Sequence, residues 1–332
     1  MKRLKKLLTG VTTAVALTVV LAACGENDES DTANADDGNN NNGASEEEEE
    51  ATDDREDWPD EFVYGLVPGE DPSVLESRWD PMREFLEERL GIPVEFFHGT
   101  DYTAMIEAMR GGHVHQAHFG PFAYTLAHER AGAEAFAMGI NDLEDAAYNS
   151  IIITLEDSGI ETLEDLEGKD FAWVDPTSAS GHLFPKAHLI NELGITNDEV
   201  DEMFGNVVFA GGHDSAFISV LNGDVDAAGV ADFIIGNLED THGDHPEYDN
   251  IKIVSTTGDI PRGPDAYLAD LPESLKEELQ QAFADMAEQE ELQEFLEAAN
   301  FQAGWIEVDD SDFDIMRETA EALGMSPEEL LN

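Results

Sequence analysis

The segment FAWVDPTSASGH, residues 171–182, joins a short apolar strand to the start of a helix. Phe171–Val174 has the composition of a buried strand, and His182–Leu193 has the apolar spacing of a helix. Three hydroxyl side chains and the unpaired N–H groups of a helix N-terminus meet in the loop between them. Such N–H groups and the helix dipole favour a bound anion. A plain helix cap at Ser178 or Ser180 explains the same residues, so the segment alone leaves both interpretations open.

Similar units of strand, loop and helix recur through the 275 residues from 58 to 332. The expected strands are Phe62–Val67, Val94–Phe97, Gln116–Phe119, Tyr148–Leu155, Phe171–Val174, Val207–Phe209, Ala227–Val230, Ile251–Val254 and Ala266–Leu268. The expected helices are Arg78–Leu90, Tyr102–Arg110, one that begins at Pro121, His182–Leu193, Ser215–Leu221, and most of the last 60 residues. This repetition predicts α/β layers with a mostly parallel sheet.

A chain of this length can form two lobes, and its composition changes in two places, near 145–150 and near 251–258. We expect the chain to leave the first lobe at the earlier place and to return at the later one. The first lobe would then contain residues 58–147 and 256–332, and the second lobe residues 148–255.

The N-terminus has the pattern of a secretion signal over residues 1–23. The apolar stretch Leu7–Ala22 follows four basic residues, Lys2, Arg3, Lys5 and Lys6. The run Leu-Ala-Ala-Cys that ends at Cys24 resembles the lipobox of bacterial lipoproteins, which implies cleavage before Cys24 and a lipid on its sulfur. An ordinary secreted protein with a free thiol is the alternative. Residues 24–57 are acidic and lack apolar periodicity, which predicts a disordered linker.

The charge of the chain is strongly negative, with 16 Lys and Arg against 75 Asp and Glu and a net charge of −59. From residue 58 onward there are still 60 acidic residues and 11 basic ones. This balance argues against a nucleic-acid partner, because phosphate backbones bind basic surfaces. Self-repulsion of this size is relieved when salt screens it. We therefore expect a high-salt environment, with acidic runs such as Glu273–Glu278 forming exposed helix faces.

Motifs for catalysis and for metal binding are weak. None of the serines lies in a Gly-x-Ser-x-Gly turn, and the phosphate-binding loop and dinucleotide-binding patterns are missing, so we expect neither an enzyme nor a cofactor. The cluster of His113, His115 and His118 could offer two imidazoles on one face of a strand. Partly exposed histidines at the end of a strand are favoured over a Zn²⁺ or Cu²⁺ site as the explanation of that cluster, and we predict no metal site.

Residues from about 62 to 300 resemble the phosphonate and phosphite solute-binding proteins of ABC importers. The motifs that carry the resemblance are Asp101-Tyr102, Phe119-Gly120-Pro121, Tyr148, the loop from Asp175 to Gly181, Gly212-His213-Asp214, and Ile260-Pro261-Arg262-Gly263-Pro264. The resemblance implies a type II periplasmic-binding-protein fold, in which two α/β lobes are joined by two crossover strands and hold the ligand in the cleft between them.

The resemblance also implies a set of ligand-binding residues. The implied hydrogen-bond donors are Tyr102, Tyr148, Ser178, Ser180 and His213. Ala179 stands where some members have a hydroxyl group, and Asp232 lies near the place of an acid that binds a ligand amine. Gly263 stands where aminophosphonate binders carry a second acid, which leaves phosphite, methylphosphonate, hypophosphite or phosphate as the favoured ligands. We expect His213 to hold its proton beside such an oxyanion.

The function implied is that of a monomeric receptor, anchored to the outer face of the cell membrane by the lipid on Cys24. It would bind a small phosphorus oxyanion and deliver it to the transmembrane subunits of an ABC permease. A receptor of the same fold for another small anion or a metal chelate is one alternative, and a secreted enzyme is the other.

Overall fold

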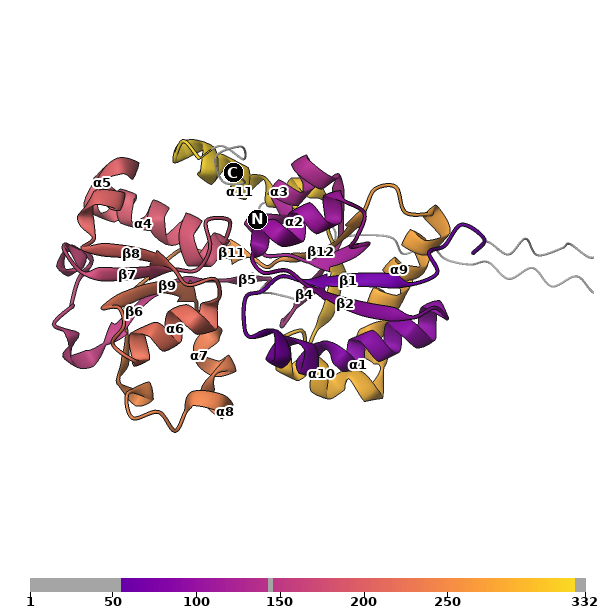
Figure 1. Ribbon diagram of the computed structural model, residues 1–332, viewed down its shortest axis with the longest axis horizontal. Coiled ribbons are helices and arrows are strands. Elements are labelled where there is room, and N and C mark those ends of the chain that lie inside the picture. The colour runs from indigo at the N-terminus through magenta and orange to yellow at the C-terminus, as the bar shows by residue number, and fades with distance from the viewer. Residues whose placement is uncertain (1–54, 143–145, 326–332) are drawn as a thin grey trace, which may run out of the picture. The chain divides into compact units, whose positions relative to one another are not determined.

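The computed structural model describes residues 55–142 and 146–325, which belong to one compact unit with two main β-sheets (Figure 1). The predictions for the signal peptide, for Cys24 and for most of the linker fall outside the described residues. In the described part, no helix is both long enough and apolar enough to span a membrane.

The first sheet has six strands in the order β13-β4-β12-β3-β1-β2. These strands are β1 (Phe62–Leu66), β2 (Val94–His98), β3 (Gln116–His118), β4 (Ala133–Ile140), β12 (Pro264–Leu268) and β13 (Gly304–Glu307). Its helices are α1 (Pro72–Leu90), α2 (Tyr102–Arg110), α3 (Pro121–Ala131), α9 (Glu273–Asp285), α10 (Gln293–Ala298) and α11 (Asp314–Ala322). Side chains of α1, α9 and α10 share one apolar core, and side chains of α2, α3 and α11 belong to another. The two groups of helices cover opposite faces of the sheet (Figure 1).

The second sheet has five strands in the order β10-β6-β9-β7-β8. These strands are β6 (Ser150–Leu155), β7 (Asp170–Trp173), β8 (Asn206–Phe209), β9 (Ala227–Ala231) and β10 (Ile251–Thr256). Its helices are α4 (Phe184–Leu193), α5 (Asn197–Met203), α6 (His213–Leu221), α7 (Ile234–Asn237) and α8 (Glu239–His242). Single 3₁₀ turns occupy Glu156–Ser158, Leu163–Leu166, Tyr248–Asn250, Met286–Glu288, Glu290–Leu292 and Asp310–Phe313.

A short ribbon connects the two sheets. Strands β5 (Ala147–Tyr148) and β11 (Ile260–Pro261) pair antiparallel, with Ile260 opposite Tyr148. The chain passes from the first sheet to the second through β5 and returns through β11, so the ribbon contains both crossovers (Figure 1). The predicted two-lobed α/β fold with two crossover strands is confirmed.

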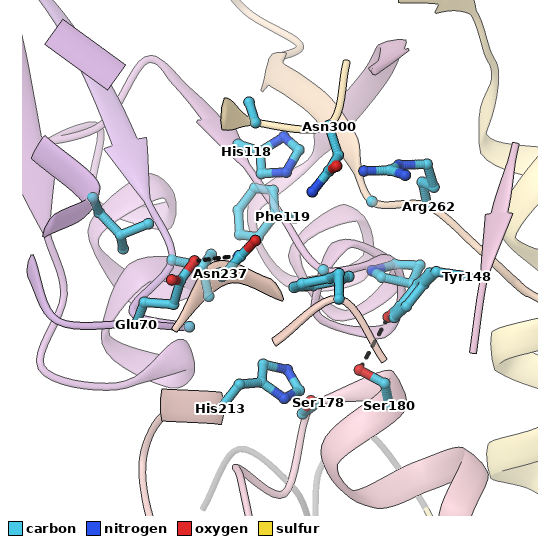
Figure 2. Close-up of a pocket in the computed structure, with 18 of the residues that line it drawn as sticks. Glu70, His118, Phe119, Tyr148, Ser178, Ser180, His213, Asn237, Arg262 and Asn300 are labelled. Atoms are coloured by element: carbon cyan, nitrogen blue, oxygen red, sulfur yellow. Dashed lines mark hydrogen bonds between the residues drawn. The ribbon is translucent and has the colours of Figure 1, made fainter. Parts of the chain in front are cut away.

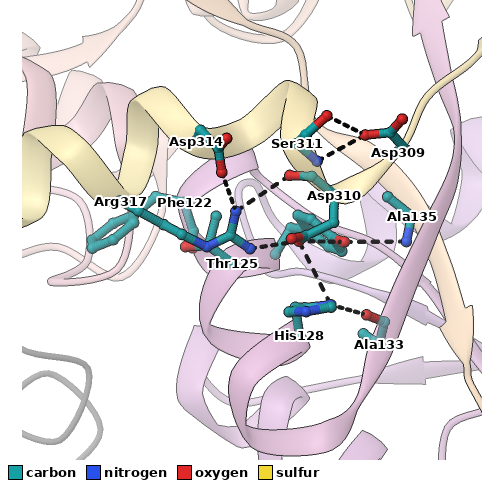
Figure 3. A network of polar contacts seen from close by, with 11 residues as sticks. Phe122, Thr125, His128, Ala133, Ala135, Asp309, Asp310, Ser311, Asp314 and Arg317 are labelled. Atoms are coloured by element: carbon teal, nitrogen blue, oxygen red, sulfur yellow. Dashed lines mark hydrogen bonds and ion pairs between the residues drawn. The ribbon is translucent and has the colours of Figure 1, made fainter.

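The last helix is fixed to the first lobe by a polar network around Asp310 (Figure 3). The Asp310 carboxylate accepts a hydrogen bond from the Tyr124 hydroxyl at 3.0 Å and forms an ion pair with Arg317. His128 lies 3.6 Å from the same carboxylate, and its Nδ1 bonds to the Ala133 carbonyl oxygen at 2.8 Å. Helices α3 and α11 are therefore held together by charge and hydrogen bonds as well as by apolar contact.

The predicted strand directions were partly wrong, because both sheets are mixed rather than mostly parallel. In each sheet three strands are parallel: β1 with β2 and β3, and β7 with β8 and β9. The strands next to the crossovers run against them, as β12 does with β3 and β6 does with β9. A strand that returns from the other lobe enters the sheet from the opposite end, which reverses its direction.

Several element bounds also differ from the predicted ones. Helix α1 begins at Pro72, six residues before Arg78, because the Asp71 side chain accepts the Ser73 N–H and caps it. The predicted strand Tyr148–Leu155 is divided into β5 and β6, and β4 was not predicted. Helix α6 begins at His213 rather than at Ser215.

Candidate functional site

A cavity of about 170 Å³ lies between the two lobes. Its first-lobe wall comes from the loops after β1 and β3 and from α1, and its second-lobe wall comes from the β7–α4 loop and the starts of α6 and α7. Residues of the crossover ribbon close it on a third side. Six of the seven predicted ligand-binding residues line this cavity: Tyr102, Tyr148, Ser178, Ala179, Ser180 and His213.

The loop from Asp175 to Gly181 shapes the second-lobe wall. Asp175 Oδ1 accepts the N–H of Thr177 at 2.8 Å and its hydroxyl at 2.7 Å, which folds the loop back after β7. Burial raises the pKa of Asp175, although these hydrogen bonds oppose the shift. A π-helical turn, Ala179–Leu183, then leads into α4. A Cβ atom at Gly181 would lie 2.3 Å from the Val174 side chain, so this sharp turn requires glycine.

The two serines of this loop have different roles. Ser178 Oγ accepts the Gly181 N–H at 3.0 Å and caps the turn, so the capping interpretation is confirmed for this residue. Ser180 is not the cap. Its Oγ accepts a hydrogen bond from the Tyr148 hydroxyl at 3.2 Å inside the cavity (Figure 2). The Ser180 hydroxyl can therefore replace its hydrogen bond with Tyr148 by a hydrogen bond to a ligand oxygen.

Two tyrosines supply further hydroxyl groups to the same place. Tyr102 is the first residue of α2, whose N-cap Asp101 accepts the Ala104 N–H at 2.7 Å. Burial raises the pKa of Tyr102, and the nearby Asp175 raises it further. Burial also raises the pKa of Tyr148 to about 12. Both phenols therefore keep their protons at neutral pH and can donate hydrogen bonds to an anion.

His213 presents one defined proton to the cavity. Its Nδ1 accepts the Ala231 N–H at 3.1 Å, so the neutral ring carries its proton on Nε2. Burial lowers the pKa of His213 to about 4. A second proton on Nδ1 would face the Ala231 N–H and break that bond. The expectation of a charged His213 is corrected accordingly: the ring is a neutral donor.

Asp232 does not line the cavity, in contrast to the prediction. Its carboxylate accepts the Asn149 N–H at 3.1 Å and so faces the backbone beside the crossover ribbon. Burial raises its pKa. Gly263 does line the cavity, but a Cβ atom there would lie 1.8 Å from the Phe119 carbonyl oxygen, so no side chain fits at this position.

Sequence reasoning missed several residues of the cavity, among them Glu70. The Glu70 carboxylate forms a two-pronged ion pair with Arg78, with N–O distances of 2.7 and 3.1 Å. It also accepts a hydrogen bond at 3.3 Å from Asn237, which belongs to the second lobe (Figure 2). Its position in the loop that follows the parallel strand β1 is the signal that could have indicated it, because ligands bind at such strand ends.

The two lobes also meet through backbone groups beside the cavity. The Gly69 carbonyl oxygen accepts the His213 N–H at 2.7 Å, and Asp214 accepts the Asp71 N–H at 2.8 Å. The loop after β1 thus contacts the N-terminal end of α6. These contacts, together with the bond between Glu70 and Asn237, hold the lobes closed over the cavity.

The histidine cluster divides between two environments. His115 Nδ1 accepts the Val63 N–H at 2.9 Å, and burial lowers the pKa of this histidine. His118 lines the cavity instead. In the described ranges, no group of three or more His, Cys, Asp or Glu residues is placed to hold a metal ion.

The cavity wall formed by Ser178, Ser180, Tyr102, Tyr148 and His213 is a cluster of neutral donors. A tetrahedral oxyanion has several acceptor oxygens, and neutral O–H and N–H groups can bind it without a dense cationic cluster. In a site that excludes water, such hydrogen bonds are stronger than in solvent. The geometry therefore suits the binding of a small anion within a strongly acidic protein.

Comparisons with known proteins point to one family. Residues 64–313 match the family model described as "ABC transporter, phosphonate, periplasmic substrate-binding protein". The chain is 35% identical over 195 residues to the phosphate-import protein PhnD of Mycolicibacterium smegmatis, which covers 57% of this chain and 60% of that protein. It is 28% identical over 247 residues to the phosphonates-binding periplasmic protein of Escherichia coli, which covers 73% of this chain and 70% of that one.

A solved structure shows the same fold. The binding component of an ABC phosphonate transporter from Pseudomonas aeruginosa superposes with a TM-score of 0.74 at 24% identity, over 80% of this chain and 86% of that one. At this level of identity the likeness supports the two-lobed architecture.

Proposed function

The chain belongs to the family of phosphonate substrate-binding proteins of ABC transporters, and on that basis we propose that it binds a phosphorus oxyanion outside the cytoplasm and delivers it to a permease. The proposed ligand class is phosphonate, phosphite or phosphate. The observation that carries the proposal is the cluster of neutral donors from both lobes around the N-terminal end of the Ala179–Leu193 helical segment. The relatives described above are transport proteins, which supports a role in binding rather than catalysis.

We propose that the oxyanion lies between Ser180 and His213 on the second lobe and Tyr102 on the first, with Tyr148 of the crossover ribbon beside it. The Ser180, Tyr102 and Tyr148 hydroxyls and His213 Nε2 would donate to its oxygens, and Ala179 would contribute backbone. Ser178 lines the same cavity and also caps the turn, where its Oγ accepts the Gly181 N–H. The proposed lobes are residues 58–147 with 256–332, and residues 148–255.

Calorimetric titration with phosphite, phosphate, methylphosphonate and 2-aminoethylphosphonate tests the ligand class. We expect at least one of the first three to bind with a 1:1 stoichiometry, because the cavity holds neutral donors for a tetrahedral anion. Acetate and a ferric chelate serve as controls for other receptors of the same fold. Tighter binding of either control than of all four phosphorus compounds would contradict the proposal.

The location of the protein is a further part of the proposal. We propose that residues 1–23 are removed, that Cys24 carries a lipid, and that residues 24–57 link the anchor to a monomeric binding domain. Cys24→Ala should then release the protein from the membrane fraction or leave it uncleaved. Mass spectrometry of the wild-type protein measures the lipid directly, and a fully soluble product of unmodified mass would refute the anchor.

A further inference from the structure

The cavity has a second polar wall that the donors described above do not use. Figure 2 shows His118, Asn300 and Arg262 on one side of the cavity, and Ser178, Ser180 and His213 on the opposite side. His118 ends β3, Asn300 lies between α10 and β13, and Arg262 directly follows β11. The fold thus gathers three side chains from distant parts of the sequence at one place.

His118 is held in position by a buried carboxylate. Its Nδ1 lies 3.4 Å from Asp265 Oδ2, and the two residues are opposite each other in the pairing of β3 with β12. Asp265 is fully buried and also accepts hydrogen bonds from the Tyr64 hydroxyl and from Trp305 Nε1. With Nδ1 directed at Asp265, the other ring nitrogen of His118 lies on the opposite side of the imidazole.

Asn300 has a left-handed backbone conformation at the end of α10. Its φ angle of 58° makes it the one non-glycine residue with positive φ among residues 55–142 and 146–325. Asparagine tolerates this left-handed region better than most residues, but glycine adopts it without cost. Asn300 follows the C-cap of α10, and its left-handed backbone ends the helix, with the Phe301 N–H bonded to the Leu296 carbonyl oxygen at 2.8 Å. Its side chain lines the cavity, where the amide can donate and accept hydrogen bonds.

Arg262 gives this wall a positive charge. Its guanidinium lies 5.5 Å from the centre of the Phe301 ring, which also lines the cavity. A guanidinium has five N–H donors, so it can bind a ligand in addition to its protein contacts. Asp232 is within electrostatic reach of Arg262, but its carboxylate faces the Asn149 N–H outside the cavity lining. The acidic Glu70 of the cavity is already paired with Arg78.

The size of the cavity also exceeds that of a phosphoryl group alone. Its volume of about 170 Å³ is roughly ten times the minimum that a single water molecule needs. A ligand whose phosphonate is bound by the first wall therefore has room for an organic substituent that reaches the second wall.

We propose that Arg262, Asn300 and His118 form a second subsite, which binds a carboxylate on the organic substituent of the ligand. The preferred ligands are then phosphonates that carry a carboxylate rather than an amine. This inference rests on the proposed function, since the phosphonate end occupies the site between Ser180 and His213.

Calorimetry with four ligands at one high salt concentration tests the second subsite. The ligands are methylphosphonate, phosphonoacetate, propylphosphonate as its apolar counterpart, and 2-aminoethylphosphonate. We expect phosphonoacetate to bind at least about tenfold more tightly than propylphosphonate, because it gains charge-assisted hydrogen bonds. We expect 2-aminoethylphosphonate to bind more weakly than either, because its ammonium group would face Arg262.

Two variants test whether the preference for phosphonoacetate depends on Asn300 and Arg262. Asn300→Gly removes the amide at a backbone position that glycine favours, and Arg262→Gln removes the charge. Each should reduce the preference for phosphonoacetate over propylphosphonate by roughly tenfold and should change methylphosphonate affinity little. Arg110→Gln is the matched control, because Arg110 is an exposed residue of α2 that pairs with Glu107 outside the cavity.

The outcomes separate this inference from the proposed function. If methylphosphonate binds but phosphonoacetate gains nothing over propylphosphonate, the second subsite is refuted and the proposed function stands. If 2-aminoethylphosphonate binds most tightly, the second wall attracts a cation and the inference is also wrong. If none of the four ligands binds but phosphite or phosphate does, the second subsite is refuted and the proposed function stands. If phosphite and phosphate fail as well, both the proposed function and the second subsite fail. Thermal scans of each variant confirm that the protein is folded.

Discussion

Ser180→Ala is expected to weaken methylphosphonate binding by roughly tenfold to a hundredfold while the melting temperature stays unchanged. A hydrogen bond from a neutral donor to a charged ligand is worth about 1.5–3 kcal/mol, which corresponds to that range of affinity. The Ser180 side chain bonds to Tyr148 across the cavity and does not cap the helix, so its loss costs the fold little. Calorimetry beside a melting scan measures both quantities.

Ser178→Ala is the matched control for this result. Ser178 Oγ accepts the Gly181 N–H at 3.0 Å, and loss of a helix cap typically costs about 1 kcal/mol of stability. We therefore expect a lower melting temperature for Ser178→Ala and a constant one for Ser180→Ala. If Ser180→Ala lowers the melting temperature and binds methylphosphonate at full strength, Ser180 is a structural residue and our assignment is wrong.

Tyr148→Phe extends the test to the partner of Ser180. The two hydroxyls share one hydrogen bond in the cavity, and both would turn to the same ligand. Their effects on affinity should then not be additive, since residues in one hydrogen-bond network interact energetically. A double-mutant cycle measures this interaction. Strict additivity of the two losses would place the hydroxyls on independent parts of the ligand.

The loop from Asp175 to Gly181 could be predicted because its information is local. An apolar strand, a polar loop and a helix with a glycine in the first turn follow one another within about twenty residues. This order predicts a loop whose N–H groups can bind an anion, although a plain helix cap explains the same residues. The resemblance to a transport family then supplied Tyr102, Tyr148 and His213, which the structure brings to the same cavity. The strand, the loop and the helix could therefore be predicted from the sequence, and the binding role of the loop stays a prediction.

The second wall could not be predicted, although His118 belongs to the histidine cluster and Arg262 to the Ile260–Pro264 motif, because neither pattern indicates that these side chains meet. His118 reaches the cavity since β3 pairs with β12, a strand about 150 positions later in the chain that also positions Asp265. Asn300 differs from its neighbours by its left-handed backbone angle, and the sequence does not show that its side chain lines the cavity. The missed strand β4 has the sequence AEAFAMGI, whose alanines and glycine have low strand propensity, so its pairing with β12 and β13 decides its structure.

The protonation of His213 shows a different limit of prediction from the sequence. A general argument about a histidine near an oxyanion predicts a charged ring. The backbone N–H of Ala231 reverses that conclusion, because it occupies Nδ1 and leaves the proton on Nε2. The hydrogen bond comes from β9, which the sequence does not place beside His213.

Raising the salt concentration from about 0.1 M to about 1 M is expected to increase the melting temperature by about 10 °C or more. Over this range the screening length falls from about 10 Å to about 3 Å. From residue 58 onward the chain has 60 acidic and 11 basic residues, so screening removes far more repulsion than attraction. A gain of about 4 kcal/mol in the free energy of unfolding would produce a shift of this size.

Helix α9 and the turn after it show where this repulsion arises. Glu273 and Glu277 are exposed one turn apart on α9, and Glu288, Glu290 and Glu291 are exposed in the following turns. Like charges at this spacing on a helix are destabilising. The double variant Glu273→Gln and Glu277→Gln should therefore melt at a higher temperature than the wild type in low salt and should lose that advantage near 1 M salt.

Screening can be separated from a general effect of cosolutes by the choice of salt. Sodium, potassium and choline chloride at equal ionic strength should raise the melting temperature similarly, whereas sucrose acts by exclusion from the surface and not through charge. If sucrose reproduces the effect, or if the wild type and the double variant respond to salt equally, charge repulsion is not the cause. A melting temperature that stays constant from 0.1 to 1 M chloride would refute adaptation to high salt.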